Sequence, residues 1–107
     1  MAKFGGFMGG GNNMQALMRQ AQKMQEEALK AQQEVDEAEV EGSASGGLVK
    51  VVMHGNKEVV SLSIDPSVVD PEDVEMLEDL IVAALNDASN KADELKKSKM
   101  GGFGGLL

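Results

Sequence analysis

Apolar residues recur at alternating intervals of three and four positions through the first third of the chain. The set is Met14, Leu17, Ala21, Met24, Ala28, Ala31, Val35 and Ala38. This spacing is a heptad seam, and it predicts one continuous helix of about thirty residues, roughly 43 Å long. Asn12 or Asn13 can cap its start, and Gly42 lies just past its end. So long a helix outruns the core of a small domain, so it must project or pair with another helix.

The hydrophobic period changes to two between Leu48 and Ile64, which is typical of strands. Gly55-Asn56 predicts a two-residue hairpin turn, which places Val51 opposite Val60 and Val49 opposite Leu62. A further short strand is expected over 40–45, with Gly46-Gly47 as its turn. These three strands form an antiparallel sheet.

A second long helix is expected to start at Asp70-Pro71, with Asp70 as the cap and Pro71 in the first helical position. Its apolar positions continue to Leu95, and basic residues precede Gly101. The predicted fold is therefore α+β: a long N-terminal helix, a three-stranded antiparallel sheet and a long C-terminal helix. One domain over 12–99 is expected between flexible glycine-rich tails at 1–11 and 100–107.

The residue inventory argues against an enzyme. Among 107 residues there is no cysteine and only one histidine, which excludes disulfides, thiol catalysis and cysteine-ligated metal sites. No grouping of catalytic residues is found, so we expect no cofactor, no metal and no small-molecule substrate. No apolar run reaches the roughly 18 residues of a membrane span. We therefore expect a cytoplasmic protein without a membrane partner.

Charge is distributed unevenly along the chain, whose net charge is −8. Up to Gln25 every charged residue is basic, whereas 26–41 holds seven acids and only Lys30 as a base. The stretch 65–87 carries eight acids and no base, and four lysines follow within 91–99. Because the two helices run to and from the sheet, we expect their basic segments to meet at distal tips on an otherwise acidic particle.

The monomer looks incomplete, because apolar residues occupy both faces of the predicted sheet and two helices outrun it. A two-fold homodimer with projecting helical arms would resolve this. Phosphates, such as those of DNA, would be attracted to the basic segments. The candidate DNA-binding residues are Arg19, Lys23, Lys30, Lys91, Lys96, Lys97 and Lys99. The alternative is that these are solvated charges that complement the helix ends.

Several segments resemble the YbaB/EbfC family of bacterial nucleoid-associated proteins. They are Met14–Gln25, Gly46–Val51 followed by Gly55, Ile64-Asp65-Pro66 and Glu75–Ala88. The resemblance implies a tweezer-like homodimer that binds DNA, alters its conformation and resides in the cytoplasm on the nucleoid. It suggests effects on gene expression, nucleoid organisation and DNA protection.

Two other functions share this plan of elements. A prefoldin-like coiled-coil chaperone would hold unfolded clients at apolar arm tips, whereas basic tips favour DNA. A protein adaptor would instead dock a basic partner on the acidic body.

Overall fold

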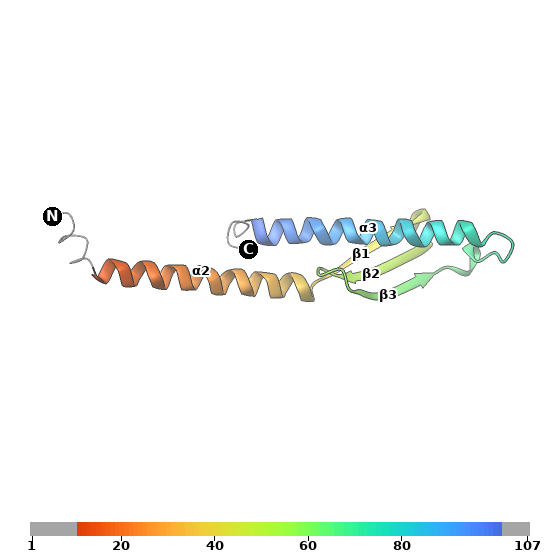
Figure 1. Ribbon diagram of the computed structural model, residues 1–107. Coiled ribbons are helices and arrows are strands. Elements are labelled where there is room, and N and C mark those ends of the chain that lie inside the picture. The colour runs from red at the N-terminus through yellow and green to blue at the C-terminus, as the bar shows by residue number, and fades with distance from the viewer. Residues whose placement is uncertain (1–10, 102–107) are drawn as a thin grey trace.

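The computed structural model describes residues 11–101 and confirms the α+β fold. The elements are α2 (Gly11–Glu37), β1 (Glu39–Ala44), η1 (Ser45–Gly47), β2 (Val49–His54), β3 (Val59–Ile64), η2 (Pro66–Val68) and α3 (Val74–Met100). The molecule is elongated, 83 × 19 × 16 Å. The sheet lies at one end, and both helices extend from it in the same direction (Figure 1). Most of the two predicted tails lies outside the described residues, but Gly11 begins α2 and Met100 ends α3.

The sheet has the order β1-β2-β3 with antiparallel neighbours, but the predicted hairpin register is wrong. Val51 pairs with Leu62 and Val49 with Ile64, two residues later on β3 than expected. The connection spans 55–58 because the His54 N–H donates to Glu58 O at 2.8 Å and the Lys57 N–H donates to His54 O at 2.8 Å. A shift of two preserves the faces, so Val49, Val51 and Leu62 still share one side.

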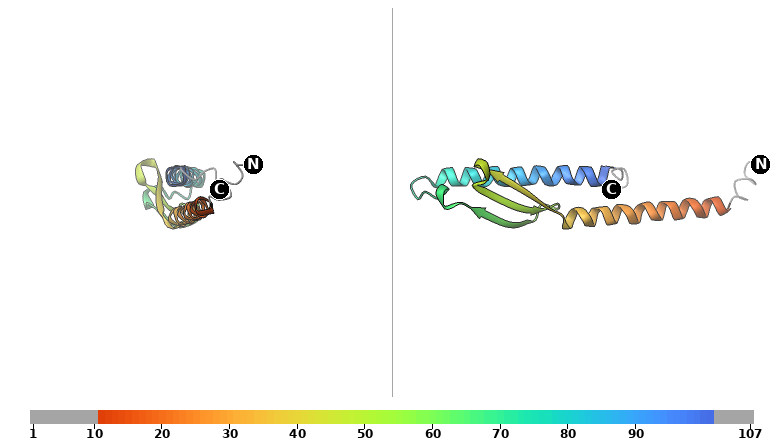
Figure 2. Two further views of the ribbon diagram at one scale, coloured as in Figure 1. Left: turned by 90° about the vertical axis from the view of Figure 1, so that its left-hand side faces the viewer. Right: turned by 180° about the vertical axis from the view of Figure 1, so that it is seen from behind.

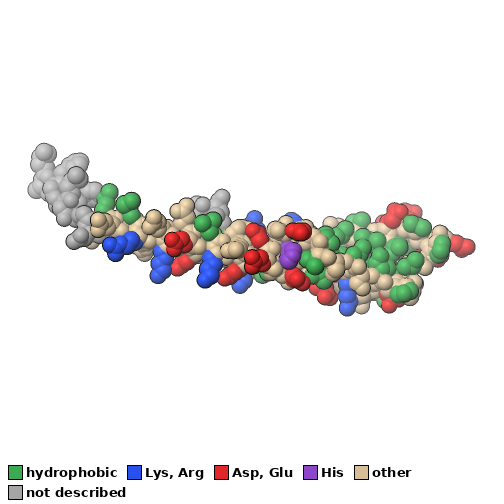
Figure 3. All heavy atoms as spheres, turned by 90° about the horizontal axis from the view of Figure 1, so that it is seen from below, with side chains coloured by type: hydrophobic (Ala, Val, Ile, Leu, Met, Phe, Trp, Pro, Cys, Tyr) green, Lys and Arg blue, Asp and Glu red, His purple; other side chains and the backbone are tan. Residues whose placement is uncertain are grey.

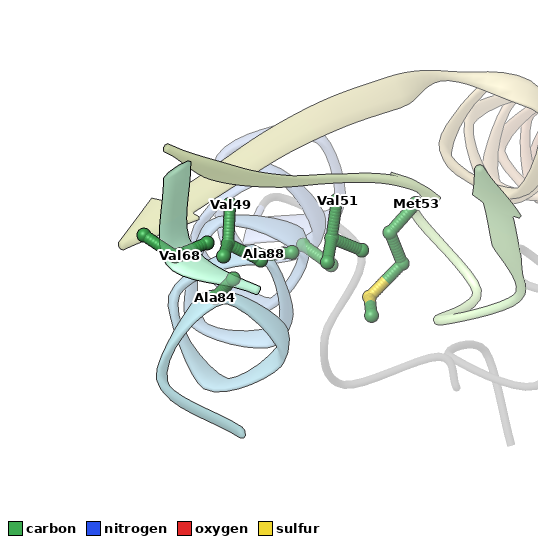
Figure 4. Close-up of a cluster of buried hydrophobic side chains, with 7 residues drawn as sticks. Val49, Val51, Met53, Val68, Ala84 and Ala88 are labelled. Atoms are coloured by element: carbon green, nitrogen blue, oxygen red, sulfur yellow. The ribbon is translucent and has the colours of Figure 1, made fainter. Parts of the chain in front are cut away.

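The core lies where α3 crosses β1 and β2. Val49, Val51 and Met53 point from β2 toward α3, and Ala84, Ala88 and Val68 close the cluster (Figure 4). Alanines on α3 let the helix approach the sheet closely. The approach is tightest at Gly42, where an added Cβ would lie 2.5 Å from Ala84 O and 2.7 Å from Ala88 Cα. Gly42 is therefore a packing residue inside β1, and its predicted position just past the end of the first helix is wrong because α2 ends at Glu37.

The start of α3 also lies later than predicted. Asp73 is the N-cap, and its carboxylate accepts the Met76 N–H at 3.2 Å. Asp70 instead closes a turn before the helix, accepting the Glu72 N–H on its side chain at 2.9 Å and the Asp73 N–H on its carbonyl at 2.9 Å. The Asp-Pro pair thus initiates a turn, and Asp73 takes the capping role.

The β2–β3 turn attaches α2 to the body. The Gly55 N–H donates to Ala38 O at 2.9 Å, and His54 Nδ1 lies 3.2 Å from Glu37 O. On the other side of the turn, Lys57 Nζ is 2.9 Å from Asp93 Oδ1 on α3. One turn therefore contacts the end of α2 and the C-terminal part of α3, and it fixes where the arm leaves the sheet.

Candidate nucleic-acid interface

Helix α2 extends well beyond the end of α3 and forms a projecting arm (Figures 1 and 2). Lys57 places Asp93 level with the base of α2, so only the last seven residues of α3 run beside it. At 1.5 Å per residue this leaves about 30 Å of α2 with no neighbouring helix among the described residues. Every described side chain from 13 to 27 is exposed, whereas Ala28 and Val35 are buried.

The basic residues of α2 lie on one side of this arm. Arg19, Lys23 and Lys30 are separated by four and seven positions, which places them within about 40° around the helix. Lys and Arg side chains line one edge of the arm, and hydrophobic side chains gather over the sheet end (Figure 3). The apolar seam faces the opposite way, so the basic side remains open to a partner.

Three predicted site residues, Lys96, Lys97 and Lys99, occupy the end of α3. Lys99 Nζ lies 3.9 Å from Glu34 Oε2, in the acidic part of α2. The basic segments of the two helices therefore do not meet at a common tip, and that expectation is wrong. The reason is that α3 lies on the sheet as far as Ala92, whereas α2 joins the sheet at its edge. The structure thus holds two separate basic tiers, one on each helix.

Lys91 lies on the body rather than on an arm. Its Nζ donates to Glu41 O at 2.8 Å and lies 3.4 Å from Asp87 Oδ2. The Ser43 N–H donates to the same carboxylate at 2.9 Å. This bond, with a smaller contribution from Lys91, holds the pKa of Asp87 below its ordinary value despite partial desolvation. Asp87 and Lys91 therefore form hydrogen bonds with backbone groups at the outer edge of β1. No sequence motif indicates this contact.

The described residues hold no cluster of three or more His, Cys, Asp or Glu side chains that could bind a metal ion. Within the same part of the chain, no helix is long and apolar enough to cross a membrane. His54, the sole histidine of the sequence, faces the carbonyl oxygens of Glu37 and Ala38. Its position at the end of α2 is consistent with a structural role.

The fold and the arm define a class: small α+β proteins that present basic side chains on a projecting helix. Residues 8–107 match the sequence model of the YbaB/EbfC DNA-binding family, and the chain belongs to that family. The resemblance seen in the sequence is thereby confirmed.

Relatives support this assignment over nearly the whole chain. A nucleoid-associated protein of Rhodococcus jostii is 55% identical over 101 residues, covering 91% of this chain and 89% of its own. One from Mycobacterium tuberculosis is 48% identical over 97 residues, covering 91% and 73%. Among solved structures, an uncharacterized protein from Helicobacter pylori matches with a TM-score of 0.65 and 27% identity, covering 85% and 94%.

Proposed function

We propose that the chain binds duplex DNA as a homodimer through phosphate contacts of its arms, alters the conformation of the DNA, and acts on the nucleoid in the cytoplasm. The single observation that carries the proposal is the basic side of α2, formed by Arg19, Lys23 and Lys30 on a chain of net charge −8. The acidic body repels phosphates away from the two basic tiers, so contact is concentrated at these tiers, foremost along the arm. Family membership and the names of the relatives support DNA as the partner.

An uncovered apolar surface beside α3 supports the homodimer. Helix α3 covers mainly β1 and β2, so Val59 and Leu62 on β3 are 49% and 46% exposed although their pairing partners on β2 are buried. Val74 and Val82 on α3 are also exposed. A second copy can cover β3 and these exposed residues of α3. In a two-fold dimer each copy makes the same contacts to the other.

The other edge of the sheet is closed to such an addition. Asp87 accepts the outward N–H of Ser43, and Lys91 donates to the outward carbonyl of Glu41. An incoming strand at β1 would have to displace both side chains. The homodimer therefore forms on the β3 side.

Salt dependence tests the DNA interface. The log of the affinity should fall with the log of salt concentration at a slope of about −0.9 for each phosphate neutralised. Arg19→Gln/Lys23→Gln should weaken binding to unrelated duplexes alike and flatten the slope, because phosphate contacts carry no sequence information. Lys96→Gln/Lys97→Gln tests the α3 tier in the same way.

Lys50→Gln is the control, since Lys50 is exposed on β2 of the sheet, whereas Lys57 pairs with Asp93 beside the base of the arm. If this change abolishes binding and the arm variants bind normally, DNA lies on the sheet and the arm mechanism is refuted. If the parent binds no DNA at low salt but suppresses client aggregation, the prefoldin-like function takes its place.

Light scattering tests the homodimer. The parent should have about twice the chain mass of 11.3 kDa at micromolar concentration. Leu62→Asp should give a folded monomer, because the side chain is half exposed in one copy but would put an unpaired charge inside the interface. Ser61→Asp, on the opposite face of β3, is the control that should remain a dimer. A monomeric parent would contradict the proposal.

A further inference from the structure

The apolar seam of α2 is only half used within one chain. Ala28 and Val35 are buried, but the same three-and-four spacing continues outward through Met14, Leu17, Ala21 and Met24, where every side chain is exposed. We call these four residues the arm seam. Leu17 is 64% exposed, although its position in the heptad is that of a core residue. The periodicity of a helix pair thus persists where the described part of the chain supplies no second helix.

We propose that the arm seam binds the arm seam of a second copy in antiparallel orientation, and that this contact joins two DNA-bound dimers. The inference rests on the proposed function, because it takes the basic side of the arm as the DNA-binding side. Its own basis is the pattern of size and charge along residues 13–25.

Side-chain size favours an antiparallel pair of identical arms. If two copies are aligned about residue 19, Leu17 of one lies opposite Ala21 of the other, and Met14 lies opposite Met24. A large residue then faces a small one at the centre, and two flexible thioethers fill each end. A parallel pair would instead place Leu17 against Leu17 and leave a gap between the two Ala21 residues.

Charge also favours a second copy. The positions flanking the arm seam hold Asn13, Met18, Gln20 and Gln25, none of them charged. Two identical arms therefore meet without like-charge repulsion. Arg19 and Lys23 lie on the far side of the helix, so pairing leaves them exposed. A pair of arms presents basic residues on two opposite outer faces, an arrangement that can hold two duplexes.

The size of the arm seam sets when the contact forms. Three large side chains and one alanine on each copy bury roughly half of the ~800 Å² per partner of a standard interface. Such a contact is weak between free dimers. It forms readily when DNA holds the dimers close together, because the effective concentration is then high.

A bridging assay tests the inference. A bead-bound duplex should capture a second, labelled duplex in the presence of the parent protein. Leu17→Gln/Met24→Gln should bind a single duplex within about twofold of the parent but capture at least ~10-fold less of the second duplex, because the gain from linked contacts is lost. Gln22→Ala, an uncharged change outside both the arm seam and the basic side of the same helix, should bridge like the parent.

Cross-linking gives an independent readout, because the chain has no native cysteine. On DNA, Leu17→Cys should be joined to a second copy by a short bis-maleimide, and Ala16→Cys should not. Since dimers already contain two chains, size exclusion after cross-linking must show a four-chain species. A two-chain species alone would overturn the proposal.

The remaining outcomes separate the two proposals. If the parent binds single duplexes but neither bridges nor cross-links, the arm-seam contact is refuted and the proposed function stands. If a chain ending at Gly101 cross-links on DNA and the full chain does not, residues 102–107 occupy the arm seam and the proposal fails. If the parent binds no DNA, the proposed function fails first.

Discussion

The substitution Gly55→Ala should tilt the arm, because Gly55 packs against the last turns of α2. An added Cβ would overlap the Val35 carbonyl oxygen and would lie 2.8 Å from its carbonyl carbon and 2.9 Å from Cγ1. Ordinary contact needs about 1 Å more, and Val35 is fully buried, so it cannot give way alone. The Gly55–Ala38 hydrogen bond, about 4.5 Å further along the helix, acts as the pivot.

The geometry converts this small overlap into a large movement. A displacement of about 1 Å over a 4.5 Å lever corresponds to roughly 13°, and Met14 lies about 36 Å from the pivot, so the arm tip should move by about 8 Å. If the arm does not yield, the overlap should instead cost about 1–3 kcal/mol of stability. Either response weakens DNA binding only if the direction of the arm matters for that contact.

Electron-paramagnetic distance measurements can detect the movement. Spin labels at Gln15→Cys and Ser63→Cys, on labelled protein diluted with unlabelled chains, report the distance from tip to sheet within one chain. Gly46→Ala is the control: an added Cβ there has nothing within 4 Å, but the φ of 68° should cost about 1 kcal/mol without moving α2. The reasoning is refuted if Gly55→Ala changes neither the distance distribution nor the melting temperature.

Three further substitutions follow from the packing and the ion pairs. Gly42→Ala should destabilise by about 3 kcal/mol, because its Cβ would overlap α3 backbone, and calorimetry should show a fall of ~4–8 °C per kcal/mol. Asp87→Asn should be less stable than the parent at pH 7. The pKa of Asp87 is lowered from 3.8, so the stability that its carboxylate contributes is present above that pH and is lost as the pH falls through the folded value. The free energies of unfolding of the two proteins, measured by denaturation, should therefore converge as the pH falls below about 4. Lys99→Gln should leave the melting temperature within about 3 °C, since its ion pair is exposed.

Local patterns were sufficient to predict the type and order of the elements. The heptad seam predicted α2, and the period of two predicted β2 and β3. The errors arise where tertiary contacts override a local signal. Gly55-Asn56 is typical of a two-residue turn, but Gly55 bonds to Ala38 O, and Lys57 adopts a φ of 72° within a longer loop. A glycine such as Gly42 is typical of a helix end, but position 42 requires glycine because α3 packs closely against it. No neighbouring residue in the sequence indicates that contact.

The candidate site residues were predicted from the charge along the chain, without their positions around the helix. That three bases lie on one side of α2 follows from residue numbers and helix geometry alone. The position of one basic tier relative to the other does not follow from these, because it depends on where α3 leaves the sheet. That point is set by Ala84, Ala88 and Ala92, whose burial in the core holds all but the last turns of α3 against the strands.

The stagger of the two helices has a functional consequence. Both are 27 residues long, yet their different attachment leaves about 30 Å of α2 with no neighbouring helix in the described part of the chain, the axial length of about nine base pairs. Over that length the helix has a basic side and, opposite it, an uncovered apolar side. A longer α3 would cover the apolar side. The arm could then bind DNA on its basic side but could not pair with a second arm. The position at which α3 ends therefore decides whether the arm offers one binding surface or two.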